Sequence, residues 1–243
     1  MFRVYLLRLL FRLSLAGAVI YMYAARREIL AAAPGFSLGG PFTPLHILWA
    51  LLMLDMLPHF FPTRRNSLAG KKQFSSYYKP LAAGAPPQKL TEYVKRVNKR
   101  AGMVMAVWLG CHALLIPLCL KGVIGPPELI ALSAAYSVAD LVCILFFCPF
   151  QKWFMKCRCC IDCRIFEWGH FMMFTPMLFF KSVYSCSLFL CAFLLLLEWE
   201  INFARRPRQF WPTANAALNC VNCRDKLCRI KRPKAVGKKP EQE

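Results

Sequence analysis

Long apolar segments dominate this chain and leave few folds open to it. Mostly apolar residues fill 5–25, 45–61, 102–120 and 129–150, and a further apolar stretch covers 165–198. A transmembrane helix needs about 20 such residues in succession. These runs lack the alternation of polar and apolar faces that a soluble amphipathic helix shows. We therefore expect an all-α integral membrane protein, a bundle of five or six transmembrane helices.

The distribution of charge indicates how these helices are oriented. The chain has 32 Lys and Arg against 12 Asp and Glu, a net charge of +20. Residues 62–100 hold ten basic residues and one acidic residue, and residues 199–243 hold eleven and four. Basic loops of membrane proteins lie in the cytoplasm. We expect a cell-membrane protein with both termini cytoplasmic, in contact with anionic lipid headgroups and without a nucleic-acid partner.

Two regions follow from this pattern. Residues 1–150 are expected to form four helices around the basic cytoplasmic loop 62–100, whose segment 90–100 predicts a short amphipathic surface helix. In the first helix, Arg3, Arg8 and Arg12 are expected to reach back to the cytoplasmic surface. Residues 151–243 comprise a Cys-rich interfacial segment, the apolar stretch 165–198 and a basic, Cys-rich cytoplasmic tail.

The stretch 165–198 allows two interpretations. One is a single long helix over 171–197 with Lys181 at its middle, which would place the basic tail outside the cell. The other is a hairpin of helices 165–180 and 183–198, each about 24 Å long against a hydrocarbon core of about 30 Å. Two reasons favour the hairpin. It keeps the basic tail on the cytoplasmic side, and it allows the two cysteine runs of the chain to meet.

The two cysteine runs, 157–163 and 220–228, lie at the expected membrane surface and hold seven of the 13 cysteines. A C-x-x-C turn brings two sulfurs onto one ion, and two such pairs complete a tetrahedral thiolate site. We predict a metal site, zinc or an iron–sulfur cluster; redox thiols and palmitoylation are the alternatives. Flanking basic residues are expected to lower the thiol pKa values. The candidate ligands are Cys157, Cys159, Cys160, Cys163, Cys220, Cys223 and Cys228.

Four ionisable residues within the predicted helices are candidates for a functional role. Asp55 and His59 stand four residues apart and therefore share a helix face. His112 and Asp140 lie near the middle of the third and fourth helices, where they are placed to pair. Such groups are costly in lipid and often functional, although an interhelical contact that fixes packing is the simpler interpretation. His170, close to the first cysteine run, is an additional candidate metal ligand.

The C-terminal half resembles a known kind of sequence. The stretches CRCCIDCRIFEWGHFMMFTP, EWEINFARRPRQFW and LNCVNCRDKLCRIKR, with a weaker match at LDMLPHFFP, resemble an uncharacterised family of cysteine-rich multi-pass bacterial membrane proteins. The resemblance covers mainly residues 145–232. It implies a shared architecture and a link between the two cysteine runs, and it assigns no catalytic residue.

Three functions remain open from the sequence. The first is a membrane protein with a cytoplasmic-face cysteine metal site that joins the two runs. The second is an electron-transfer component with an iron–sulfur centre and a redox partner. The third is a small transporter that uses the intramembrane Asp and His residues. No nucleophile–base arrangement marks an enzyme, so that question stays open, and self-association to a homo-oligomer is compatible with each function.

Overall fold

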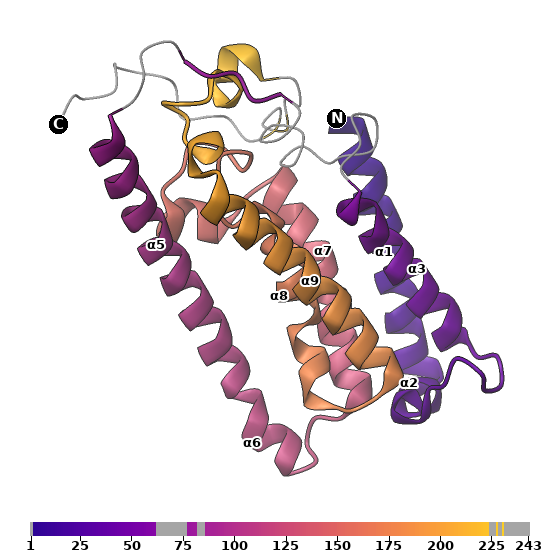
Figure 1. The fold of residues 1–243 in the computed structure, drawn as a ribbon. Helices are drawn as coiled ribbons and strands as arrows, with labels where there is room; N and C mark the ends of the chain where they lie inside the picture. The colour runs from indigo at the N-terminus through magenta and orange to yellow at the C-terminus, as the bar shows by residue number, and fades with distance from the viewer. Residues whose placement is uncertain (1, 62–76, 82–85, 224–226, 228–229, 231–243) are drawn as a thin grey trace.

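The computed structural model describes residues 2–61, 77–81 and 86–223, together with Leu227 and Ile230 (Figure 1). This part of the chain is helical and contains no β-strand. Four helical segments are long and apolar enough to cross a membrane: α1 (Phe2–Ala25), α5 (Pro87–Ala113) with α6 (Leu115–Leu120), α7 (Pro126–Leu145) and α9 (Val183–Arg205). A shorter apolar helix, α3 (Pro44–Phe60), and the short α2 (Arg27–Ala31) complete the first half.

Capping residues define where the helices begin. Thr43 precedes α3, and its backbone N–H donates to Nδ1 of His46 (3.1 Å). Glu128 closes the first turn of α7 by accepting from the Gly125 N–H (2.8 Å). Ser182 precedes α9 and accepts from the Tyr184 N–H (3.2 Å). These contacts satisfy backbone donors that have no partner inside the helix.

Two helix boundaries differ from the sequence prediction. The expected surface helix over 90–100 is not separate, because α5 runs through it into the apolar part without a breaker. The fourth helix ends at Leu145 and not at Phe150. Pro149 explains the early end, since a proline disfavours helical backbone in the residue before it. A short π-helical segment, η3 (Phe150–Met155), follows and leads into the first cysteine run.

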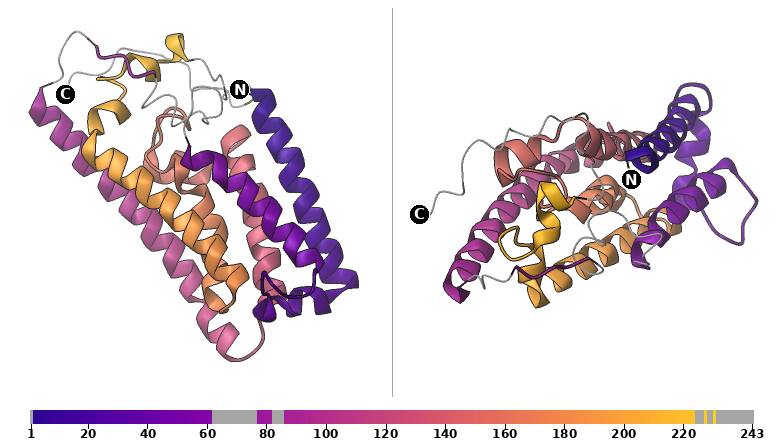
Figure 2. Two further views of the ribbon diagram at one scale, coloured as in Figure 1. Left: turned by 45° about the vertical axis from the view of Figure 1, so that its right-hand side comes forward. Right: turned by 90° about the horizontal axis from the view of Figure 1, so that it is seen from above.

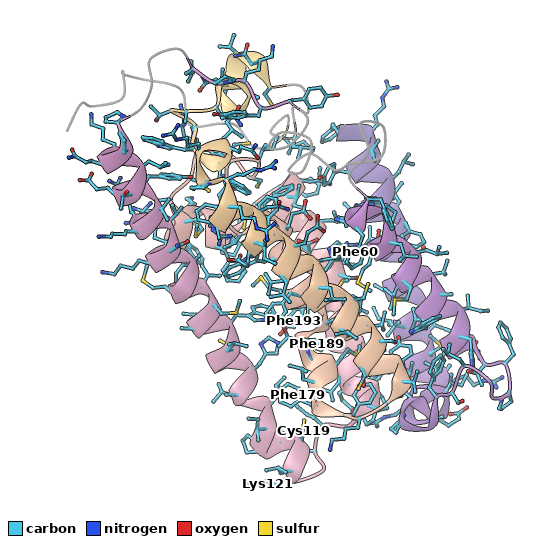
Figure 3. All side chains as sticks on the ribbon, in the orientation of Figure 1. Phe60, Cys119, Lys121, Phe179, Phe189 and Phe193 are labelled. Atoms are coloured by element: carbon cyan, nitrogen blue, oxygen red, sulfur yellow. The ribbon has the colours of Figure 1, made fainter. Side chains whose placement is uncertain are left out.

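The chain reverses direction within the stretch 165–198. Short helical segments, η4 (Phe166–Trp168), α8 (Gly169–Phe174) and η5 (Thr175–Phe179), descend from the cysteine run, and α9 returns beside them. Phe189 and Phe193 of α9, labelled in Figure 3, pack with Phe171 of α8 at ring-centroid distances of 5.8 and 6.5 Å. The turn lies at 180–182, and the returning helix is longer than the predicted 183–198.

The helices form one bundle with two distinct ends. Helix α1 packs on α7, and α3 packs on α9. The start of α1 and the end of α9 lie at the same end of the bundle, whereas α2 and α6 lie at the opposite end (Figures 1 and 2). Helix α5 contacts the remainder of the bundle mainly through its polar half, where it packs against η3 and the tail segment η6 (Pro207–Phe210).

The remaining short elements place the tail and the outer loop. A 3-10 turn, η1 (Ala33–Gly35), follows α2. The tail continues through η7 (Ala216–Leu218) and η8 (Cys220–Asn222). An isolated β-bridge joins Pro80 to Asn215, so the end of the basic loop lies against the tail.

Candidate functional site

Arg12 lies at the centre of a buried cluster of ionisable side chains. Its guanidinium donates from Nε and Nη2 to Oδ2 of Asp55 (3.1 and 2.8 Å). Its Nη1 donates to Oδ2 of Asp140 (2.8 Å) and to the carbonyl of Ser137 (3.0 Å), and Nη2 also donates to Nε2 of His170 (3.2 Å). All five N–H donors of the guanidinium therefore have acceptors within the protein.

The position of Arg12 corrects one prediction. We expected the side chain to reach the cytoplasmic surface, but it is 2% exposed. A buried charge is tolerated when it is paired and fully hydrogen-bonded. Carboxylates from α3 and α7 meet that condition for Arg12, so the inward orientation is the favoured one.

Two histidines extend the cluster toward the end of the bundle that holds the N-terminus. Arg8 Nη1 lies 3.1 Å from Nε2 of His59, and His59 Nδ1 lies 3.1 Å from Oε2 of Glu167. An arginine can only donate, so Nε2 of His59 and Nε2 of His170 are both acceptors. We therefore assign both rings as neutral with the proton on Nδ1, and His59 as the donor to Glu167.

Asp140 is the more accessible of the two carboxylates that share Arg12. Its side chain is 19% exposed, against 6% for Asp55. Asp55 also lies 3.9 Å from Arg8, whereas Asp140 pairs with Arg12 alone within the described residues. Of the two carboxylates, Asp140 thus has fewer positive charges near it and the more exposed side chain.

Gly169 allows α8 to begin directly beside Asp140. A Cβ atom at this position would lie 2.3 Å from Oδ1 of Asp140, much closer than two such atoms can approach. The absence of a side chain at Gly169 is therefore what places the start of α8, and with it His170, next to α7.

A cavity of about 260 Å³ opens beside Asp140. Its walls come from α5, α7, the first cysteine run and the start of α8. Asp140 is its one charged side chain among the described residues, and most of the remaining lining is apolar or aromatic. The main lining side chains are Trp108, Tyr136, Phe150, Phe166, Cys160 and Met172.

His112 does not pair with Asp140, contrary to the prediction. Its Nδ1 lies 2.8 Å from the carbonyl of Trp108, one turn earlier in the same helix, and donates a hydrogen bond to it. Its ring packs against Trp108 and Tyr136, with centroids 4.5 and 5.6 Å apart. His112 thus supports the aromatic wall of the cavity, while Asp140 finds its partner on α1.

The first cysteine run forms the tight turn expected of C-x-x-C. The Cys163 N–H donates to the Cys160 carbonyl (3.1 Å). The Cys160 thiol lies 3.1 Å from Oε1 of Gln151, and the Cys159 N–H donates to Oδ1 of Asp162 (3.0 Å). Both Cys160 and Cys163 line the cavity.

For Cys157, the predicted effect of the flanking basic residues is wrong. A hydrogen bond with Cys163, together with burial, raises the pKa of the Cys157 thiol well above its usual range. Burial also raises the pKa of Asp162 to about 6. The flanking Lys156 and Arg158 are exposed, so water screens their charges. For Asp162, the effect of burial therefore outweighs the attraction of Arg158.

Arg164 attaches the cysteine run to α9. Its guanidinium pairs with the carboxylate of Glu200 and lies 3.8 Å from the ring centroid of Phe203. Trp199 Nε1 donates to the Arg164 carbonyl (2.7 Å), and Trp168 Nε1 donates to Glu200 (2.8 Å). These contacts hold the loop at the end of α9 from which the tail begins.

The second cysteine run lies partly within the described residues. Cys223 donates its N–H to the Cys220 carbonyl (3.3 Å), which is again the C-x-x-C turn. Cys223 packs against the same apolar cluster as Cys157, Cys159 and Cys163, whereas Cys220 is exposed. Cys228 lies outside the described residues. Within the residues that are described, no three His, Cys, Asp or Glu side chains are grouped as metal ligands.

The remaining predicted residues have clear positions. Asp55 and His59 share a buried face of α3, as their spacing predicts. His170 lies with Arg12, with its Nε2 3.8 Å from Oδ2 of Asp55, and not with the cysteines. Arg12, Glu167 and Gly169 were not predicted from the sequence as site residues. The available signal was the spacing of Arg8 and Arg12, four residues apart within an apolar helix.

Comparison of the chain with protein-family models, with curated proteins and with solved structures gives no match.

Proposed function

We propose that this chain is a small cell-membrane transport protein in which the Asp55–Arg12–Asp140 cluster couples solute movement to a proton. One observation carries the proposal: five elements bring charged and imidazole side chains together, and two of them, α1 and α7, are long and apolar enough to span a bilayer. Ionisable groups inside a membrane protein are costly and typically line ion or substrate pathways.

In this proposal α1, α3, α5, α7 and α9 cross the membrane, and residues 166–179 form the second arm of a hairpin with α9. This gives five full spans, or six if the short arm is counted. Both termini lie on the cytoplasmic side, as the basic loop and tail favour. The lipid bilayer, with its anionic headgroups, is the partner of the outer surface.

Arg12 is the residue whose ion pairs change when Asp140 takes up a proton. When both carboxylates are ionised, Arg12 is shared between α3 and α7. A proton on Asp140 removes its charge, so the guanidinium is held more strongly by Asp55. The balance of forces between α1, α3 and α7 thereby depends on one proton. A ligand or proton that favours one arrangement shifts the populations of the two.

Proton-coupled flux in reconstituted liposomes tests this function. Vesicles containing a pH-sensitive dye would receive organic cations, organic anions and neutral solutes in turn. We expect at least one class to cause a proton flux that Asp140→Asn abolishes. Glu28→Gln, which changes an exposed carboxylate on α2, is the matched control and should keep the flux. Absence of a solute-dependent flux with all three classes would contradict the proposal.

A metal site that joins the cysteine runs is a second candidate function. It is favoured by the hydrogen bond between the side chains of Cys157 and Cys163, and by the position of Cys223 in the same apolar cluster. A zinc ion would make the site a structural scaffold, and an iron–sulfur cluster would make it an electron-transfer centre. Metal binding would release protons from these thiols, and the bound cation would offset the negative charge of the thiolates.

Metal content after anaerobic purification tests the second candidate. We expect about one structural ion or cluster per chain, as closed thiolate sites hold. Cys163→Ser and Cys223→Ser should each remove the bound metal. Cys186→Ser, which changes an exposed cysteine on α9, should leave the metal in place. A visible absorption band would identify iron–sulfur, and a colourless protein with zinc would identify the scaffold. Protein without metal would contradict the candidate.

A further inference from the structure

The lining of the cavity beside Asp140 combines a mostly apolar surface with one charged side chain. Aromatic rings and aliphatic groups form nearly all of its surface, and a single carboxylate provides its charge. Cavities that bind small molecules are commonly apolar with a few polar groups that fix orientation. The chemistry of this cavity therefore selects a ligand that is mostly apolar and carries one charge.

The sign of that charge follows from the donors and acceptors around the cavity. Arg12 is the nearest cation, but its five N–H groups are already bound to Asp55, Asp140, His170 and the Ser137 carbonyl. It has no donor left for an anionic ligand. Asp140 is the charged residue of the lining and is 19% exposed, so the cavity favours a ligand with a positive charge.

Two aromatic rings strengthen this selection. Trp108 and Tyr136 both line the cavity, with ring centroids 4.9 Å apart and planes at 57°. Trp108 is held in place because its Nε1 donates to Oγ1 of Thr175 (3.1 Å). The faces of Trp and Tyr attract organic cations, and this attraction becomes stronger as water is excluded.

We propose that this cavity binds a lipophilic organic monocation, such as an aromatic quaternary ammonium ion, with its charge at Asp140 and its apolar part against Trp108 and Tyr136. This inference rests on the proposed function and names the substrate class of the same site. The cation and a proton then compete for the Asp140 carboxylate, because a protonated carboxyl group no longer attracts a positive charge.

Competition with protons gives the binding a defined pH dependence. Arg12 of α1 pairs with Asp140, and both Asp55 of α3 and His170 of α8 are linked to it through Arg12. Tyr136 of α7 and the thiols of Cys160 and Cys163 share the cavity lining with Asp140. Protonation of Asp140 removes the attraction for the cation, so affinity is lost as pH falls.

Calorimetric titration of the full chain in nanodiscs tests the inference. Benzyltrimethylammonium is the probe, and its uncharged carbon analogue, 2,2-dimethylpropylbenzene, is the comparison ligand. We expect the cation to bind at least tenfold more tightly than the analogue, since the analogue lacks the charge that Asp140 recognises. Asp140→Asn should weaken cation binding at least tenfold, and Glu28→Gln should leave it unchanged.

A second variant guards against a folding defect in Asp140→Asn. Tyr136→Leu leaves the hydrogen bonds of Arg12 intact and should weaken the cation at least threefold while leaving the analogue nearly unaffected. Equal affinity for the two ligands would overturn the inference, as would cation binding unchanged by both substitutions. Proton flux driven by an anion or a neutral solute, without cation binding, would overturn this inference alone and leave the transport function standing.

Discussion

Replacement of Arg12 by methionine is expected to lower the free energy of unfolding by about 3–5 kcal/mol, the range for a buried ion pair that loses one partner. The change removes the guanidinium but keeps a long side chain of similar length. Asp55 and Asp140 then remain close together without their shared cation. Denaturation of the purified protein by increasing amounts of a denaturing detergent measures this loss.

Two further variants separate the charge effect from general damage. Arg3→Met changes an exposed arginine on the same helix and should shift the unfolding free energy by less than about 0.5 kcal/mol, as for other surface substitutions. Adding Asp55→Asn and Asp140→Asn to Arg12→Met removes the repelling charges and should restore most of the stability. If the triple variant were as unstable as Arg12→Met, the cluster would not be held together by its charges.

Replacement of Gly169 by alanine is expected to abolish tight cation binding while leaving the chain folded. The new methyl group would lie 2.3 Å from Oδ1 of Asp140, so either the carboxylate or α8 must move. Overpacking of this kind typically costs about 1–3 kcal/mol. Displacement of Asp140 from the cavity should weaken benzyltrimethylammonium at least tenfold in the same calorimetric titration.

Gly110→Ala is the matched control for this substitution. Gly110 lies in α5, and a Cβ atom there would meet nothing within 4 Å. Alanine has the higher helix propensity by about 1 kcal/mol, so the control should be neutral or slightly stabilising and should bind the cation normally. Normal binding in Gly169→Ala would show that the close approach of α8 to Asp140 has no part in the site.

The positions of the helices could be predicted because they depend on local sequence. The apolar runs gave α1, α3 and α7 nearly in place, and Pro44 and Pro126 mark two helix starts. The turn before α9 has its own signal in Ser182, a preferred N-cap residue. The early end of α7 was likewise marked by Pro149.

The partners of the buried charges could not be predicted in the same way. Helical spacing places Asp55 and His59 on one face, because that relation lies within one helix. Pairing Asp140 with Arg12, and not with His112, depends on how α1 packs against α7, which no local pattern specifies. Arg12 was assigned to the surface because its partners lie 43 and 128 residues away in the chain.

The account rests most directly on Asp140 as the group that holds either a proton or a cation. The decisive measurement is the affinity of the wild-type protein for benzyltrimethylammonium in nanodiscs over a series of pH values, beside Asp140→Asn. We predict that the wild-type dissociation constant rises toward a limiting slope of about tenfold per pH unit as the solution becomes more acidic, the slope of one competing proton. The weak residual binding of Asp140→Asn should be independent of pH. Wild-type affinity that does not change with pH, or an equal slope in Asp140→Asn, would contradict the account.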